Sequence, residues 1–145
     1  TWLATFYPSN LVGQWVDPNG DHDGDGIKSQ IEYAYGFSPL VFDDSDDFLV
    51  SQAPSASGST DLTIVFRRDT AATDLTYHLQ ISGDLIQWTT VAESIAGAPA
   101  AGQNGGLINS DAPLSGTVNL VSVTSNLPAG SNDKKFVRLE VIRQP

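Results

Sequence analysis

Five stretches of alternating polar and apolar residues in the second part of the chain constrain its fold more than any other feature. Each stretch mixes β-branched or aromatic residues with polar ones at a period of two, which is the pattern of half-buried strands. The stretches cover residues 62–68, 75–82, 86–93, 117–125 and 135–142. Two facing sheets would bury such strands on one side each. We therefore expect a mostly β fold, a two-layer antiparallel β-sandwich of the fibronectin or immunoglobulin kind.

The alternation also assigns the two faces of individual strands, because successive side chains of a strand point to opposite sides. One expected core-facing set is Tyr77, Leu79 and Ile81, and the other is Val137, Leu139 and Val141. Trp88 alternates with Ile86, so the burial of Trp88 in a hairpin is favoured over its exposure. His78 falls on the opposite face from Tyr77 and is expected at the surface.

Residues 1–50 form a different kind of segment, expected to hold a calcium loop and one short helix ahead of a sandwich at 59–145. Apolar residues at a spacing of four predict a helix of about ten residues from Ile27. Gly36 is suited to a left-handed cap, Phe37 can pack back onto the last turn, and Pro39 prevents continuation. The boundary is placed near Ser59, and the parts are expected to form one compact unit. For residues 96–116, a long loop and a single weak strand both remain open.

The sequence DHDGDGIKSQIE at 21–32 has the spacing of a calcium-binding loop. Alternate side chains can converge on one cation, a glycine allows the sharp turn at the sixth place, and a glutamate at the twelfth can bind through both oxygens. Ile27 would contribute its backbone carbonyl, and Ser29 would bind directly or through a water molecule. The predicted ligands of Ca²⁺ are Asp21, Asp23, Asp25, Ile27, Ser29 and Glu32.

The acidic loop also admits interpretations other than a calcium site. An acidic turn before a helix also favours the helix dipole. Mg²⁺ rarely fills a site built only of protein ligands, and His22 lies at an outward position for a transition metal. Because Pro18, Asn19 and Gly20 disfavour an entering helix, the loop is predicted to be a single structural clamp rather than half of a paired sensor. A second cation site and a solvated loop both remain open for Asp43, Asp44, Asp46 and Asp47.

Composition excludes several classes of function. The net charge is −10, which disfavours nucleic acid and anionic lipid as partners. The sequence has no cysteine, so a disulfide or thiolate site is excluded, and no apolar run is long enough to span a membrane. The chain starts at Thr1 and has no methionine, so we expect a mature secreted protein or an excised piece of one, extracellular or at the cell surface.

The calcium motif is followed by YAYGFSP, by LTIVFRRDTAATDLTYHLQISGDLIQW and by a closing FVRLEVI. Together these resemble the C-terminal modules of secreted and surface proteins from verrucomicrobial-type bacteria. The likeness extends along nearly the whole chain: a Trp-containing start, D-x-D-G-D-G leading into E-Y-A-x-G, T-Y-x-x-x-x-S-x-D-L-x-x-W, and a closing strand. It implies an extracellular, non-catalytic β module with a structural Ca²⁺ site.

Three classes of function come into question for this sequence: an enzyme, a structural subunit and a binding module. An enzyme is not expected, because no G-x-S-x-G and no cysteine is present, and the two histidines lie far apart. The favoured role is a Ca²⁺-stabilised subunit of a self-associating surface filament, layer or matrix, with copies of itself as partners. Inter-subunit contact is assigned to Trp2, Phe6 and Tyr7, with packing into their own core as the alternative. The other candidate is a non-catalytic carbohydrate-binding or adhesion module whose partner is a glycan.

Overall fold

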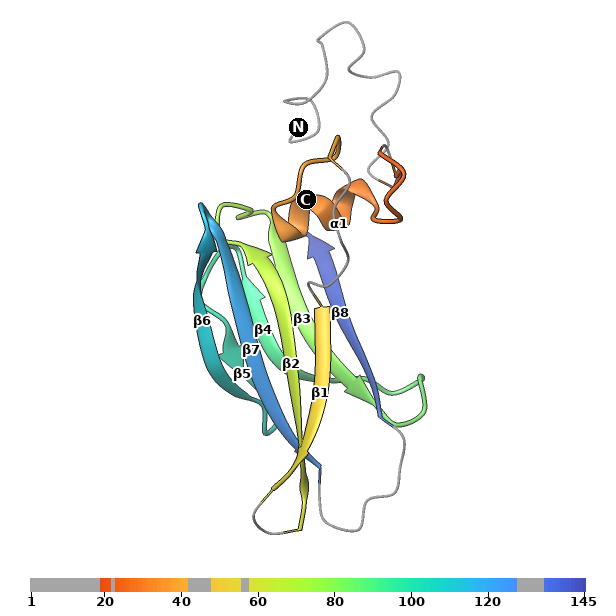
Figure 1. Ribbon diagram of the computed structural model, residues 1–145, viewed down its shortest axis with the longest axis vertical. Helices are drawn as coiled ribbons and strands as arrows, with labels where there is room; N and C mark the ends of the chain where they lie inside the picture. The colour runs from red at the N-terminus through yellow and green to blue at the C-terminus, as the bar shows by residue number, and fades with distance from the viewer. Residues whose placement is uncertain (1–18, 22, 42–47, 56–57, 128–134) are drawn as a thin grey trace, which may run out of the picture.

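The computed structural model describes residues 19–21, 23–41, 48–55, 58–127 and 135–145. In this part of the chain one short helix lies at the end of two stacked sheets (Figure 1). The elements are α1 (Ser29–Tyr35), β1 (Phe48–Pro54), β2 (Thr60–Asp69), β3 (Leu75–Ser82), β4 (Thr89–Ile95), β5 (Ala101–Gly102), β6 (Leu107–Ser115), β7 (Val118–Leu127) and β8 (Phe136–Arg143).

Within the described residues, the two sheets each contain four strands, and all strand pairs are antiparallel. Their orders are β1-β2-β7-β6 and β5-β4-β3-β8. The first order corresponds to strands A, B, E and D of an immunoglobulin sandwich. The predicted mostly β, two-layer antiparallel sandwich is thereby confirmed.

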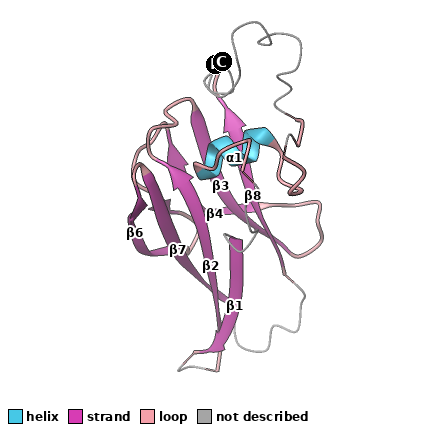
Figure 2. Cartoon of the chain, turned by 45° about the horizontal axis from the view of Figure 1, so that its top comes forward, coloured by secondary structure: helices cyan, strands magenta, loops and turns pink. Residues whose placement is uncertain are grey.

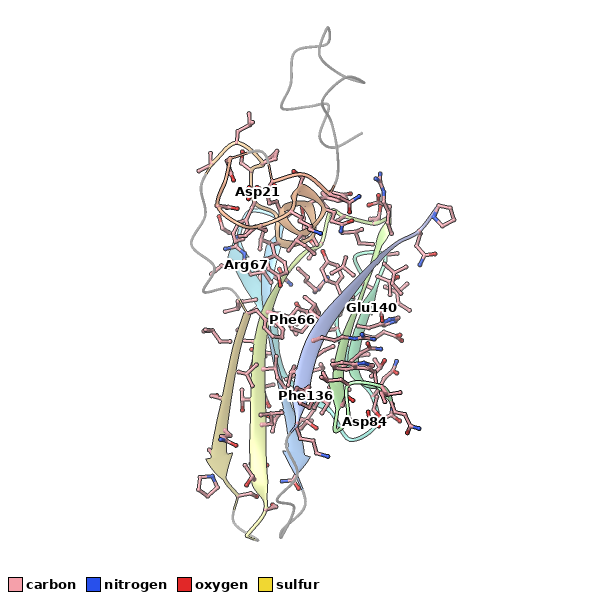
Figure 3. The ribbon with its side chains drawn as sticks, turned by 90° about the vertical axis from the view of Figure 1, so that its right-hand side faces the viewer. Asp21, Phe66, Arg67, Asp84, Phe136 and Glu140 are labelled. Atoms are coloured by element: carbon pink, nitrogen blue, oxygen red, sulfur yellow. The ribbon has the colours of Figure 1, made fainter. Side chains whose placement is uncertain are left out.

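Strand β2 shows why the sheets pack together. Its residues alternate between buried and half-buried from Leu62 to Arg68, with Ile64 and Phe66 fully enclosed. They meet Tyr77 and Leu79 of β3 in one apolar cluster, and Figure 3 labels Phe66 between the two sheets. The predicted faces are confirmed, because Ile81, Val137, Leu139 and Val141 also pack against this cluster.

Two regions differ from the expectation. The sandwich begins at β1 rather than near Ser59, because Phe48–Pro54 pairs along its whole length with β2. Residues 96–116 contain β5 and β6 instead of one loop or a single weak strand. This segment also passes close to β4: a Cβ on Gly106 would lie 1.9 Å from the carbonyl oxygen of Val91. Only glycine fits such an approach.

Helix α1 is shorter than predicted, because the loop continues through Lys28 and the helix begins at Ser29. Its predicted end is confirmed. Gly36 is left-handed (φ 73°), the N–H of Phe37 donates to the carbonyl of Glu32 at 2.8 Å, and Phe37 is buried. Figure 2 shows α1 lying across the end of the sandwich, so the acidic loop that precedes it is held at the same end.

Candidate metal centre

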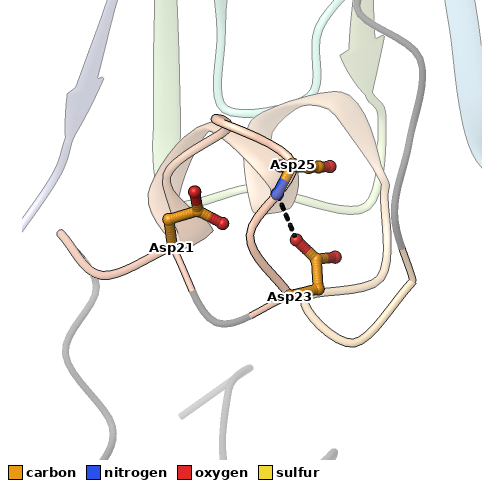
Figure 4. Close-up of side chains that lie close together, drawn as sticks. All are labelled: Asp21, Asp23 and Asp25. Atoms are coloured by element: carbon orange, nitrogen blue, oxygen red, sulfur yellow. Dashed lines mark hydrogen bonds between the residues drawn. The ribbon is translucent and has the colours of Figure 1, made fainter.

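The acidic loop brings three of the predicted ligands together. One carboxylate oxygen from each of Asp21, Asp23 and Asp25 lies within 4.8 Å of the others (Figure 4). Backbone N–H groups organise the loop: Gly24 and Gly26 donate to Asp21 at 2.8 and 2.9 Å, and Asp25 donates to Asp23 at 3.2 Å. Both glycines have positive φ. A cation at this point would relieve the mutual repulsion of three carboxylates.

Burial distinguishes two carboxylates of the motif. Oδ2 of Asp23 is shielded from solvent and accepts no hydrogen bond from the described residues. Glu32, at the twelfth place, is fully buried on the first turn of α1. Placing a carboxylate in such surroundings is costly unless positive charge or donors compensate it. The motif thus combines an exposed side, at Asp21, with a shielded one.

The other predicted ligands are Glu32, Ser29 and Ile27. The carboxylate of Glu32 does not belong to the group within 4.8 Å. Ser29 is buried, and both its N–H and its hydroxyl donate to the carbonyl of Gly20, at 2.9 and 3.0 Å. These bonds close the loop onto the helix. The N–H of Ile27 donates to Asp25 at 2.7 Å, and His22 lies outside the described residues.

Helix α1 ties the acidic loop to the sandwich through polar contacts. The hydroxyl of Tyr77 donates to the carbonyl of Ala34 at 2.5 Å and accepts from the N–H of Asp69 at 3.2 Å. Burial raises the pKa of Tyr77. Arg67 donates from Nε to the carbonyl of Tyr35 at 3.2 Å and covers the ring of Phe37. The loop is therefore joined to β2 and β3 by a helix of about two turns.

Tyr33 provides a second attachment of α1. Its hydroxyl donates to Oδ1 of Asp74 at 2.5 Å, and Arg143 donates to Oδ2 of the same carboxylate at 2.9 Å. Burial and the bond to Asp74 raise the pKa of Tyr33 to about 12. This contact links the helix to the last residue of β8.

We expect Tyr77→Phe to lower the free energy of unfolding by about 1–3 kcal/mol, because the carbonyl of Ala34 loses its buried donor. Tyr33→Phe removes a more exposed hydroxyl and should cost roughly 0.5–1.5 kcal/mol. Urea denaturation followed by fluorescence measures both. Equal costs for the two variants would contradict the assignment of Tyr77 as the main polar attachment of α1.

A buried ion pair was missed by the sequence reasoning. Arg68 reaches Asp111 on β6 with Nη2 at 2.8 Å, and both side chains are almost enclosed. Arg68 also donates to the carbonyl of Gly97, while Asp111 accepts from Ala100 and Asn119. The available signal was the register of β2, since Arg68 follows Leu62, Ile64 and Phe66 at a period of two.

The outer face of the β5-β4-β3-β8 sheet carries a row of charged side chains. His78 lies on this face as predicted, with Nε2 3.1 Å from Glu93 and Nδ1 3.8 Å from Glu140. The expected burial of Trp88 is wrong: Arg138 covers its ring at 4.0 Å on the outer face, and Ile86 is 82 % exposed. The N–H groups of Ile86 and Gln87 both bond to Asp84, so the turn extends to Gln87 and the strand alternation starts only at Thr89.

A hollow of about 500 Å³ lies at the end of the sandwich where Figure 3 labels Asp84, away from Asp21. Its lining combines apolar Ile81 and Val91 with polar side chains, which include Ser82, Asp84, Gln87, Asn104 and Lys135. Backbone donors at Gln87 and Ile86 hold the pKa of Asp84 below its ordinary value. These groups suit a small polar molecule better than an apolar one.

The remaining predicted contacts fall outside the described residues: Trp2, Phe6 and Tyr7, and the acidic group Asp43, Asp44, Asp46 and Asp47. Among the described residues, no helix is both long and apolar enough to cross a bilayer. No family model, curated protein or solved structure matches the chain.

Proposed function

We propose that this chain is a non-catalytic, Ca²⁺-stabilised structural module that works outside the cell and associates with copies of itself. One observation carries the calcium part of the proposal: the convergence of Asp21, Asp23 and Asp25 within 4.8 Å in a loop with the spacing of a calcium site. Carboxylate oxygens are the ligands that Ca²⁺ prefers. Glu32, buried on the first turn of α1, is the fourth carboxylate of the motif and lies outside this group.

The position of the loop supports a structural rather than a signalling role. The loop is closed onto α1 by Ser29, and α1 is held to the sandwich by Tyr77 and Tyr33. A cation that orders the loop would therefore stabilise the packing of α1 against β2 and β3. The ion would act as a clamp at one end of the molecule.

We expect Ca²⁺ to raise the thermal unfolding temperature relative to EDTA, because an ion bound only to the folded state stabilises it. At a free concentration of 100 Kd the gain is about 2.7 kcal/mol. Asp23→Asn should remove most of this gain while keeping an acceptor for the N–H of Asp25. Scanning fluorimetry in Ca²⁺, Mg²⁺ and EDTA, with calorimetric titration of the metal, measures the effect.

The matched control is Asp61→Asn, which changes the same charge on β2 and keeps an acceptor for Asn126. It should retain the full response to Ca²⁺. Unfolding temperatures that are equal in Ca²⁺ and EDTA would refute the clamp. An equal loss of response in Asp61→Asn and Asp23→Asn would reduce the effect to general screening of a negatively charged protein.

A further inference from the structure

The side of the sandwich bounded by β1 and β8 leaves core-facing apolar side chains partly uncovered. Val50 lies opposite Ile64 in the β1–β2 register and so shares its inner face, yet Val50 is 46 % exposed whereas Ile64 is fully buried. On β8, the inward row of Val137, Leu139 and Val141 is only partly buried. Figure 3 looks onto this side, with Phe66 visible between β1 and β8.

Strand β8 is also an open sheet edge. It pairs with β3 alone among the described residues, so one row of its backbone N–H and C=O groups has no strand partner there. In an immunoglobulin sandwich, strand F is flanked by strand G on this side. β3 and β8 occupy the places of C and F, and no described strand occupies the place of G. The described strands therefore leave the place beside β8 unfilled, and a strand with an apolar face fits it.

The N-terminal sequence has the composition that such a strand requires. Residues 1–16 carry no charged side chain in a chain whose net charge is −10, and they include Trp2, Phe6 and Tyr7. An uncharged strand can approach another copy without adding to the repulsion between two acidic molecules. The 18 residues before Asn19 can extend over roughly 60 Å, which exceeds the roughly 26 Å length of an eight-residue strand such as β8.

The attachment point of this segment favours a second copy as the donor. The carbonyl of Gly20 accepts a hydrogen bond from Ser29 at the start of α1. Tyr33 of α1 and Arg143, the last residue of β8, both donate hydrogen bonds to Asp74. An antiparallel strand from the same copy would run away from this end and then have to return along the whole of β8 to reach Asn19. A strand from a neighbour needs no such return.

We propose that residues 2–7 of one copy add an antiparallel strand to the β8 edge of the next and cover Val137, Leu139, Val141 and Val50. This inference rests on the self-association proposed above and names the two surfaces that meet. Such a contact joins two different surfaces, so its repetition from copy to copy gives chains or rings, and a reciprocal exchange gives a closed pair.

The first test is sedimentation velocity of the full chain in Ca²⁺. We expect multimers for the native sequence and monomers for Phe6→Asp, with association weakened about a hundredfold or more by an unpaired carboxylate in an apolar contact. Ile86→Asp is the matched control, because it places the same charge on an exposed apolar side chain elsewhere. At a protein concentration low enough for the native chain to be monomeric, the thermal unfolding temperature of both variants should match that of the native sequence.

The second test locates the acceptor by disulfide formation, which is unambiguous because the chain has no cysteine. Phe6→Cys mixed with Leu139→Cys should give an inter-chain disulfide, and Phe6→Cys mixed with Ser110→Cys on β6 should not. Multimers that persist in Phe6→Asp would overturn this contact and leave self-association standing. A monomeric native chain would overturn both. A disulfide formed only within the Phe6→Cys/Leu139→Cys double variant would make the segment's own copy the acceptor and overturn the inference.

Discussion

Asp111→Ala is expected to lower the free energy of unfolding by about 3–5 kcal/mol, the usual cost of leaving one member of a buried ion pair alone. Arg68 is 2 % exposed, and its guanidinium would lose three contacts to Asp111, at 2.8, 3.1 and 3.1 Å. Ala100 and Asn119 would lose an acceptor in the same substitution. Urea denaturation of native and variant protein at pH 7 measures the loss.

The double variant Arg68→Met/Asp111→Leu separates the cost of a stranded charge from the net contribution of the pair. Replacing both members by apolar groups should recover most of the stability, since buried ion pairs often contribute little beyond their own desolvation. A double variant as unstable as Asp111→Ala would show instead that the bonds to Gly97, Ala100 and Asn119 carry the stability. Single-variant losses below about 1 kcal/mol would contradict the buried pair itself.

Low pH should weaken the ion pair between Arg68 and Asp111. Burial pushes the pKa of Asp111 upward, but hydrogen bonds from Arg68, Ala100 and Asn119 outweigh it and keep the pKa below its ordinary value. A carboxyl group with a lowered pKa in the folded state stabilises the fold above its unfolded pKa. That contribution is lost as the pH falls through the folded pKa, so the pair adds to stability at neutral pH and weakens only in strong acid.

Features that depend on local sequence were predictable. The alternation along β3 distinguishes the core-facing side chains from their neighbours, so Tyr77 and Leu79 were assigned to the core from spacing alone. The acidic loop was predictable for a similar reason, because twelve consecutive residues fix the convergence of Asp21, Asp23 and Asp25. Gly36 ended the helix as expected, since its left-handed conformation is a local requirement.

Features that depend on residues distant in the sequence were not predictable. Arg68 and Asp111 are 43 residues apart, and neither residue alone indicates the other. Strand β1 has six exposed residues of seven, so no alternation marked it before its pairing with β2 was known. Strand β5 has two residues and depends on β4, and the outward position of Trp88 depends on Arg138 of β8.

Phe66→Ala is expected to cost about 3–5 kcal/mol, because it removes a large side chain from a core with little freedom to collapse. Phe66 is 1 % exposed and lies in the cluster that joins Ile64, Tyr77, Leu79 and Ala34. Leu107→Ala is the control: its side chain is 63 % exposed, so the change should stay within about 0.5 kcal/mol. Chemical denaturation of both variants measures the difference.

The same variant tests whether the acidic loop and the sandwich unfold together. Ala34 of α1 belongs to the same core cluster as Phe66. A cavity at Phe66 should therefore weaken the packing of α1 against the sandwich as well as the packing between the two sheets. If the molecule is one cooperative unit, Phe66→Ala and the removal of Ca²⁺ should each shift a single unfolding transition. If the cavity also disturbs the acidic loop through α1, Phe66→Ala should weaken Ca²⁺ binding, and the two effects on the unfolding free energy should be coupled rather than additive. Two separate transitions, with only one of them responsive to Ca²⁺, would show instead that the loop and α1 unfold independently of the sandwich. Ca²⁺ would then not stabilise the sandwich.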